Sequence, residues 1–587
     1  MNFAIKINNN LADLGELRLN TGDFPNHWAD NTLLISGECQ HIKIDFYESV
    51  NNKVWIIGDV IPETDNEKNI HQFLSHANFE WLFKTLQGHY RVIVFDKDSR
   101  KIIVASSLFG IMPVYYSKKG ENVFVSSSPE ILAKQMEQTE IDKRFILENV
   151  LFYYPLFDNT IFKGIRLLPT HHLLNITGNN ISCSRYFNVT NWFCANLIPW
   201  KKAANNISDL FIDRVKYYFP EESSEVSLTG GFDGRTLVSC AMYHHKKFKA
   251  YSFGRKNSND TTIAAELANS AGVDFSEIAL NKKYVTDQSL QNGLEFIINA
   301  GGTAGFARAH YLYAAKLLQA DTRYLITGNF GSEIFRAVHN IGAVISPNLH
   351  QLFSAGDFDA AVNKVEQSAE FNWINKNSFL NEWEELKEDF KKLPAYDPAY
   401  FSLTQNEKFY QYLLEEVFRK YFGAEMVNQS LYLNNRTPFV DTKFLEALYK
   451  TGMPGVYSDF MERNPVKRFK GQVIYAHIIK KAYPAFLNKL TDKGYAPADL
   501  LTLTGKASII GGFLSKKLFK KTGSADDSNS VDEAFEYNKP YFERLALNSV
   551  LFNKQSVEKA LQNGNCYHDF LVAMSQCYYY NHITGML

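Results

Sequence analysis

The stretch Val226-Ser-Leu-Thr-Gly-Gly-Phe-Asp-Gly-Arg-Thr-Leu-Val238 decides the fold of the larger part of this chain. A short apolar run ends at Thr229, two glycines follow, and helix-forming residues begin near Arg235. A strand, a glycine turn and a helix in this order aim the positive end of the helix at any anion held in the turn. The stretch therefore predicts a phosphate-binding turn. An ordinary strand–helix turn that needs glycines for tight packing is the alternative left open by the turn alone.

Strands and helices alternate around this turn. Apolar runs of strand length occupy 225–228, 248–253, 275–279 and 324–327, and helical spacing occupies 203–218, the residues from about 235, 262–271 and 309–318. Such alternation is typical of a parallel, doubly wound sheet, so the fold class of this part is α/β. Beyond about residue 360 the pattern is largely helical, which predicts a helical extension.

The first 190 residues have a different pattern. Short alternating runs recur about every ten residues between turn-forming residues, at 54–57, 90–95, 101–105, 114–116 and 123–126. This spacing favours hairpins in a sandwich or layered sheet. We therefore expect two domains, residues 1–195 and residues 196–587.

Composition limits the function classes. Among 587 residues, 62 Lys and Arg balance 63 Asp and Glu, so the formal net charge is −1 and neither a nucleic acid nor a membrane is an expected partner. No apolar run is long enough to span a bilayer. The six cysteines are scattered without a C-x-x-C pair, so we expect reduced thiols and a cytoplasmic protein.

The turn and several other segments carry a resemblance. Thr229-Gly-Gly-Phe-Asp-Gly234 is similar to the S-G-G-x-D-S loop of the N-type ATP pyrophosphatases, and within that group the chain resembles the asparagine synthetase family almost end to end. Further similar segments follow in the family's order at 86–96, 108–116, 159–169, 251–254, 260–267, 327–335, 436–441, 470–474 and 493–495. The resemblance implies an N-terminal αββα lobe of the Ntn-like, class II glutaminase type and a C-terminal ATP pyrophosphatase lobe.

The N-terminal lobe departs from the family pattern at three places. No cysteine follows Met1, the Asn-Gly-Glu stretch is Ile57-Gly58-Asp59, and an Arg-Asp pair is replaced by Ser106 and Ser107. The thiol nucleophile expected after Met1 and the asparagine of the oxyanion site are therefore not found, and we expect no glutaminase activity. An upstream start site or processing could restore only the first of these losses. The β-lactam and carbapenam synthetases and the lasso-peptide macrolactam cyclases, which the chain resembles in this respect, also lack the N-terminal cysteine.

The synthetase lobe departs as well. Residues 327–335 stand where the family has S-G-x-G-x-D-E-L-F. Without a gap, Ser332 replaces the aspartate and Glu333 matches the glutamate. An insertion at Asn329–Phe330 would instead put Glu333 on the aspartate, and we favour the ungapped pairing. Asn434 replaces a family glutamate, so a different residue must deprotonate the amine, or none is needed.

The resemblance implies roles for particular residues. We expect Asp233 and Glu333 to hold Mg²⁺, and Lys493 and Glu333 to act in catalysis. The expected ATP and pyrophosphate contacts are Thr229, Gly230, Gly231, Asp233, Gly234, Phe253, Gly254, Thr327, Gly328 and Lys470, with Phe253 and Gly254 near adenine. Lys493 could instead be a solvated turn lysine, and Lys470 could merely cover a helix face. Arg235 could contact a substrate carboxylate, although a surface acid is the partner we expect.

These features predict an ATP-dependent carbon–nitrogen ligase with ATP and Mg²⁺ as cofactors. A carboxylate would be activated as acyl-AMP and then attacked by an amine that glutamine does not supply. Closure of a macrolactam or isopeptide ring on a peptide or natural-product precursor is the preferred reaction, with a leader-binding or protease protein as a further partner. A lysine cluster at 516, 517, 520 and 521 could dock an acidic leader or be a solvated face. An intermolecular small-molecule ligase and a catalytically dead nucleotide-binding scaffold are the alternatives.

Overall fold

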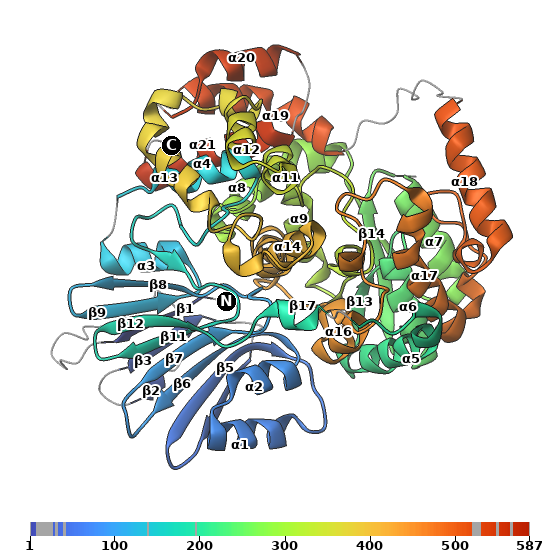
Figure 1. The fold of residues 1–587 in the computed structure, drawn as a ribbon, viewed down its shortest axis with the longest axis horizontal. Coiled ribbons are helices and arrows are strands. Elements are labelled where there is room, and N and C mark those ends of the chain that lie inside the picture. The colour runs from blue at the N-terminus through green and yellow to red at the C-terminus, as the bar shows by residue number, and fades with distance from the viewer. Residues whose placement is uncertain are drawn as a thin grey trace.

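The computed structural model describes residues 2–7, 27–29, 33–38, 43–137, 140–193, 196–256, 258–518, 530–547, 551–563 and 568–585. It contains two antiparallel sheets in the N-terminal lobe and one parallel sheet in the C-terminal lobe (Figure 1). The side chains of the lysine cluster at 516–521 lie outside the described part of the chain.

The two N-terminal sheets have six strands each. The first has the order β10 (Arg166–Leu167), β8 (Tyr115–Lys119), β9 (Asn122–Ser126), β1 (Asn2–Ile7), β3 (Leu33–Glu38) and β2 (His27–Ala29). The second has the order β12 (Asn180–Arg185), β11 (His172–Thr177), β7 (Ile102–Ser106), β6 (Gly88–Asp96), β5 (Asn52–Val60) and β4 (Ile44–Glu48). Among the described strands, β4–β5, β6–β7, β8–β9 and β11–β12 are hairpins, as the turn spacing predicts.

The two sheets pack face to face. Trp55, Ile93 and Val104 of the second sheet bury their side chains against Val123 and Val125 of the first. Helices α1 (Asn66–His76) and α2 (Phe79–Thr85) cover the second sheet, and α3 (Pro129–Met136) covers the first (Figure 1). The layers therefore follow the order αββα, which confirms the expected Ntn-like fold of this lobe.

The C-terminal sheet has the order β15 (Phe275–Ala279), β14 (Phe248–Gly254), β13 (Ser224–Ser227), β16 (Tyr324–Ile326) and β17 (Asn434–Arg436), and all four pairings are parallel. The chain order reverses between β13 and β16. In such sheets ligands bind outside the carboxyl ends of the strands at this switch point. The doubly wound sheet is confirmed, whereas β17 was not predicted.

Helices surround the parallel sheet. They are α5 (Trp200–Tyr218), α6 (Asp233–Tyr243), α7 (Asn259–Ala271), α8 (Ser289–Asn299), α9 (Ala309–Leu318), α10 (Gly331–Phe335), α16 (Thr442–Tyr449), α17 (Pro465–Ala482) and α18 (Leu503–Leu518). Among them, α17 contacts both α5 and α6, so it lies directly beside the strand–helix unit that contains the phosphate-like turn.

The remaining helices form the expected extension and join the lobes. They are α11 (Pro347–Ser354), α12 (Phe358–Glu366), α13 (Leu380–Phe390), α14 (Gln405–Tyr412), α15 (Gly423–Gln429), α19 (Ser530–Leu547), α20 (Lys554–Asn563) and α21 (His568–Thr584). Helices α13 and α21 pack against α4 (Lys143–Phe152) of the N-terminal lobe (Figure 1). In the described residues, no helix is both long and apolar enough to cross a bilayer.

Candidate active site

The predicted phosphate turn lies at the switch point of the parallel sheet. Strand β13 ends at Ser227 and α6 begins at Asp233, so the turn 228–232 joins the carboxyl end of the strand to the amino end of the helix. The backbone N–H of Gly231 donates to Oγ1 of Thr229 at 3.2 Å, which orders the turn. No side chain caps the amino end of α6, and Thr229 of the turn is exposed, so this end of the helix suits an anionic ligand.

Glycines in and near this turn are needed where two backbone segments come close together, and not for a left-handed backbone. Neither Gly230 nor Gly231 has a positive φ. A Cβ on Gly234 would lie 2.2 Å from the carbonyl oxygen of Ser227, so only glycine lets α6 start this near the strand. Gly328 is required in the same way, because its Cβ would lie 2.5 Å from Cβ of Asp233.

Asp233 lies at the centre of the hydrogen-bond network of the site. Its Oδ2 accepts a hydrogen bond from the Ser332 hydroxyl at 3.0 Å, and its Oδ1 accepts one from the Tyr475 hydroxyl. The guanidinium of Arg336 in turn donates to Oγ of Ser332. Ser332 thus lies beside Asp233, which is the arrangement that the ungapped pairing requires. Tyr475 and Arg336 were not predicted, since neither belongs to a segment that sequence spacing links to the turn.

A second feature supports the ungapped pairing. Phe330 has φ +72°, a left-handed backbone that a bulky residue rarely adopts. This residue stands where the family pattern has its second glycine. Its ring packs against Phe418 and Phe422, with centroids 4.5 and 5.0 Å away, and this burial offsets the unfavourable backbone.

Glu333 is the second carboxylate of the site. Burial, followed by the negative charge of Asp233, raises the pKa of Glu333 to about 7. A buried carboxylate whose ionised form is disfavoured by a neighbouring negative charge is suited to a bound cation. No group of three metal-binding side chains occurs in the described residues. Mg²⁺ commonly takes one or two carboxylates and completes its shell with phosphate oxygens and water, so Asp233 and Glu333 fit it when pyrophosphate is present.

Arg235 anchors the loop that carries Lys493. Its side chain is fully buried, and its guanidinium donates to the carbonyl oxygens of Lys489 at 2.6 Å and Leu490 at 2.8 Å. The expected partner, a surface acid, was therefore wrong. The N–H of Asp492 donates to the carbonyl of Gly230 at 3.2 Å, so the loop lies against the phosphate turn. The exposed Lys493 follows directly and is thereby kept beside the turn.

The other predicted contacts lie at the same edge of the sheet. Phe253 and Gly254 end β14, next to β13, and the Phe253 ring packs against His310 and Tyr311. Thr327 directly follows β16, but its hydroxyl donates to Oδ1 of Asn435 at 2.8 Å and is buried. The Thr327 side chain therefore fixes the position of the end of β16.

Lys470 is not brought to the phosphate turn by any described contact. It lines a different pocket of about 460 Å³, together with Trp200 and Lys506, and none of the described lining residues belongs to the phosphate turn. Burial lowers the pKa of Lys470.

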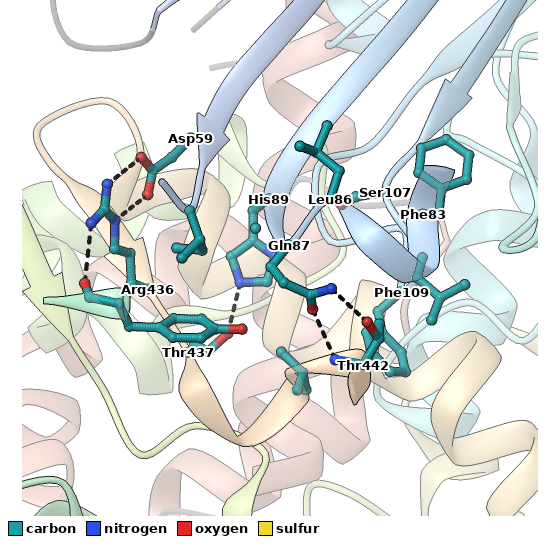
Figure 2. A pocket seen from close by; sticks show the side chains of 15 residues that line it. Asp59, Phe83, Leu86, Gln87, His89, Ser107, Phe109, Arg436, Thr437 and Thr442 are labelled. Carbon is teal, nitrogen blue, oxygen red and sulfur yellow. Dashed lines mark hydrogen bonds and ion pairs between the residues drawn. The ribbon is translucent and has the colours of Figure 1, made fainter. Parts of the chain in front are cut away.

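Two positions aligned with the glutaminase centre, Asp59 and Ser107, lie at the interface between the lobes (Figure 2). Asp59 and Ser107 line a cavity of about 20 Å³, which has room for roughly one water molecule. Three polar contacts close it: Arg436 pairs with Asp59, His89 bonds Thr437 at 2.7 Å, and Gln87 bonds Thr442 at 2.6 Å. Side chains at the interface between the lobes therefore fill most of the space around Asp59 and Ser107.

Comparisons with known proteins agree with this architecture. A glutamine amidotransferase domain model matches residues 62–187, and an asparagine synthase model matches residues 223–480. Asparagine synthetases [glutamine-hydrolyzing] 1 and 3 of Bacillus subtilis are 23% and 25% identical to the chain over 211 and 182 residues. These alignments cover 34% and 30% of this chain and 32% and 29% of those proteins.

A putative asparagine synthetase [glutamine-hydrolyzing] of Mycobacterium tuberculosis (strain ATCC 25618 / H37Rv) is 21% identical over 207 residues, covering 34% of this chain and 32% of that protein. The matched part thus spans about a third of the length of these curated relatives. A solved structure of the allosteric regulatory enzyme of purine biosynthesis matches with a TM-score of 0.20 and 8% identity, over 47% of this chain and 58% of that chain, which is too low to compare folds.

Proposed function

We propose that this chain, which belongs to the asparagine synthetase-like family, forms an amide bond with ATP through an acyl-adenylate. The observation that carries this proposal is the phosphate turn at the switch point, where Asp233 begins α6 and faces Ser332 of α10. A turn that only packed a helix on a strand would need neither an ordered carboxylate cluster nor a loop docked beside it.

The reaction has two steps. A carboxylate oxygen of the substrate attacks the α-phosphorus of ATP, the bond from that phosphorus to the bridging oxygen breaks, and pyrophosphate leaves. An amine nitrogen then attacks the acyl carbon, the bond to the AMP oxygen breaks, and the amine gives up a proton. The product is lighter than its precursors by one water.

The chain's own residues have separate parts in these steps. The N–H groups at the start of α6 bind pyrophosphate oxygens, and Arg336, held through Ser332, offsets negative charge beside them. Bound Mg²⁺ would supply further neutralisation of pyrophosphate from a position at Asp233 and Glu333. Lys493 stabilises the negative charge that develops when the amine attacks the acyl-adenylate.

We further propose that glutamine does not supply the amine. In support, Asp59 is held by Arg436, and the cavity beside it has room for about one water molecule, far less than a glutamine side chain needs. The amine then comes from a second substrate or from the molecule that carries the carboxylate. Ring closure on a peptide or natural-product precursor is the reaction we prefer, and intermolecular ligation is the alternative.

A catalytically dead nucleotide-binding scaffold is the second candidate function. One observation favours it, because both carboxylate oxygens of Asp233 accept hydrogen bonds from protein hydroxyls, at Ser332 and Tyr475. An aspartate whose oxygens are both occupied is a weaker metal ligand than a free one.

Release of AMP and pyrophosphate from ATP and Mg²⁺, with panels of peptides and amino acids, tests the proposal. We expect both products from the wild-type protein, none from Asp233→Ala, and an organic product lighter by one water. The mass of that product distinguishes ring closure from ligation. Bound ATP without pyrophosphate for any substrate would support the scaffold, and ADP in place of AMP would contradict the acyl-adenylate.

A further inference from the structure

The pocket lined by Lys470 opens on a different face of α17 from the phosphate turn. Lys470 precedes Tyr475 by five residues, which places the two side chains about 140° apart around the helix and about 7.5 Å apart along it. Tyr475 faces Asp233, whereas Lys470 faces the pocket of about 460 Å³. One helix therefore separates the phosphate turn from a second space, whose volume is typical of small-molecule sites.

One side of this pocket is apolar and aromatic. The residues that form it are Trp200, Met453, Tyr457 and Val473. Met453 and Val473 are buried, and the hydroxyl of Tyr457 donates to the carbonyl of Tyr449 at 2.7 Å. These contacts hold the wall in place without a ligand, so an apolar group can enter a preformed surface.

The opposite side carries an excess of positive charge. Lys467 is neutralised by Asp459 at 2.6 Å and Glu462 at 3.2 Å. Lys470 and Lys506 also line the pocket, and in the described part of the chain neither has a carboxylate within ion-pair distance. The three lysines and two carboxylates that line the pocket leave an excess of one positive charge, on the Lys470 and Lys506 side, beside an aromatic wall.

We propose that this pocket binds a carboxylate carried on an aromatic or apolar body, such as an acidic residue or chain end beside an apolar side chain of a peptide. The apolar wall would bury the body, and Lys470 and Lys506 would bind the carboxylate. This assignment rests on the proposed function for its substrate class, since it makes the pocket an anchor for a part of the substrate remote from the reacting groups. Such an anchor would let binding energy position the carboxylate that is activated.

Binding of N-acetyl-L-phenylalanine, compared with its uncharged amide, tests the pocket by ligand-observed NMR on the full chain without ATP. The two probes differ only in the anionic group. We expect the acid to bind at least about tenfold more tightly than the amide, the range of a charge-assisted contact. Lys470→Met and Lys506→Met keep the aliphatic stems and should each remove most of that preference.

Three further variants test where the acid binds and whether the lysine charge is what binds it. Lys481→Met changes a lysine on the same helix that pairs with Asp209 and lies outside the pocket, and it should leave binding unchanged. Asp233→Ala should also bind the acid normally, because the pocket is separate from the nucleotide turn. Lys470→Arg keeps the charge and should retain the preference for the acid, which distinguishes loss of charge from misfolding.

Equal binding of acid and amide, or an acid preference that survives both lysine-to-methionine variants, would overturn the assignment. Tighter binding of phenyl phosphate than of the carboxylate would overturn it too, in favour of a phosphate site. ATP turnover is measured separately. Loss of AMP release with the acid preference intact would therefore count against the proposed function and not against the pocket.

Discussion

Arg436 of the synthetase lobe holds Asp59 of the N-terminal lobe in a two-pronged ion pair, with Nε–Oδ2 at 2.7 Å and Nη2–Oδ1 at 2.9 Å. The same guanidinium donates to the carbonyl of Tyr218 and lies over the ring of Tyr324 at 4.3 Å. A residue aligned with the glutaminase centre is thus part of the contact between the lobes. Asp59 is one half of a buried ion pair at this interface, and Arg436 is the other half.

Asp59→Asn is expected to destabilise the protein by about 2–4 kcal/mol, because it leaves the guanidinium of Arg436 buried without its counter-ion. Urea unfolding measures this change. Glu140→Gln, which breaks the exposed pair with Lys163, is the control and should cost less than about 1 kcal/mol. An equal effect of both variants would mean that the lobes do not depend on the Asp59 contact.

Glutamine is not expected to serve as amine donor. With ATP, Mg²⁺ and an accepted carboxylate, glutamate release from glutamine should not exceed that of a protein-free blank, because the cavity at Asp59 has room for only about one water molecule. A coupled glutamate assay measures this, with ammonium chloride as a separate donor. Glutamate formed in step with AMP would show that the N-terminal lobe is an active glutaminase.

The sequence predicts most of the parallel sheet because short runs of strand length alternate with helical spacing, with glycine or polar turns between them. Strand β15 and helix α9 have the predicted bounds. Strand β17, Asn434–Arg436, was missed because three polar residues carry no strand pattern, and only its pairing with β16 makes it a strand. Local periodicity does not report a pairing that depends on a partner about a hundred residues away.

The sequence predicted the phosphate turn of the site but not the contacts that distant segments make with it. The turn at 229–234 has a local signature, since glycines between a strand and a helix are visible in any sequence. Arg235 was assigned to a surface acid, yet it is buried on the carbonyls of Lys489 and Leu490. Tyr475 was missed altogether. Both contacts join segments more than 200 residues apart, and no spacing rule connects such segments.

Ser332→Asp is expected to lower the Mg²⁺ concentration that half-saturates pyrophosphate release, by about tenfold or more. The new carboxylate would stand beside Asp233, where the Ser332 hydroxyl now donates, and would add an oxygen ligand for the cation. Ser332→Ala is the control, because it removes the hydroxyl without adding charge. An unchanged Mg²⁺ requirement in Ser332→Asp, with Arg336 pairing to the new acid, would show that arginine provides the charge compensation at this position.

Stability is expected to fall as pH rises from about 4.5 to about 7 through the contribution of Glu333. The folded-state pKa of Glu333 is raised to about 7, by burial first and by Asp233 second. The folded protein therefore binds more protons than the unfolded chain in this window, and each pH unit costs up to about 1.4 kcal/mol. Glu333→Gln should remove this slope, as measured by urea unfolding at several pH values.

Ligand binding provides a second check on Glu333. If a cation lies between Asp233 and Glu333, Mg²⁺–ATP should release close to half a proton at pH 7, seen by calorimetry in buffers of different ionisation enthalpy. Glu333→Gln should abolish that release. A pH slope and a proton release that both persist in Glu333→Gln would assign the titration to another group.

Arg235→Met is expected to lower kcat at least about tenfold while changing KM for ATP by less than about threefold. Without the guanidinium, the carbonyls of Lys489 and Leu490 lose their buried donor, and the loop that holds Lys493 beside Gly230 loosens. Steady-state pyrophosphate release gives both constants. Because Arg235 acts through Lys493, the double variant Arg235→Met/Lys493→Met should be little slower than Lys493→Met alone. Additive losses in the double variant would instead mean that Arg235 supports the fold of the phosphate turn independently of Lys493.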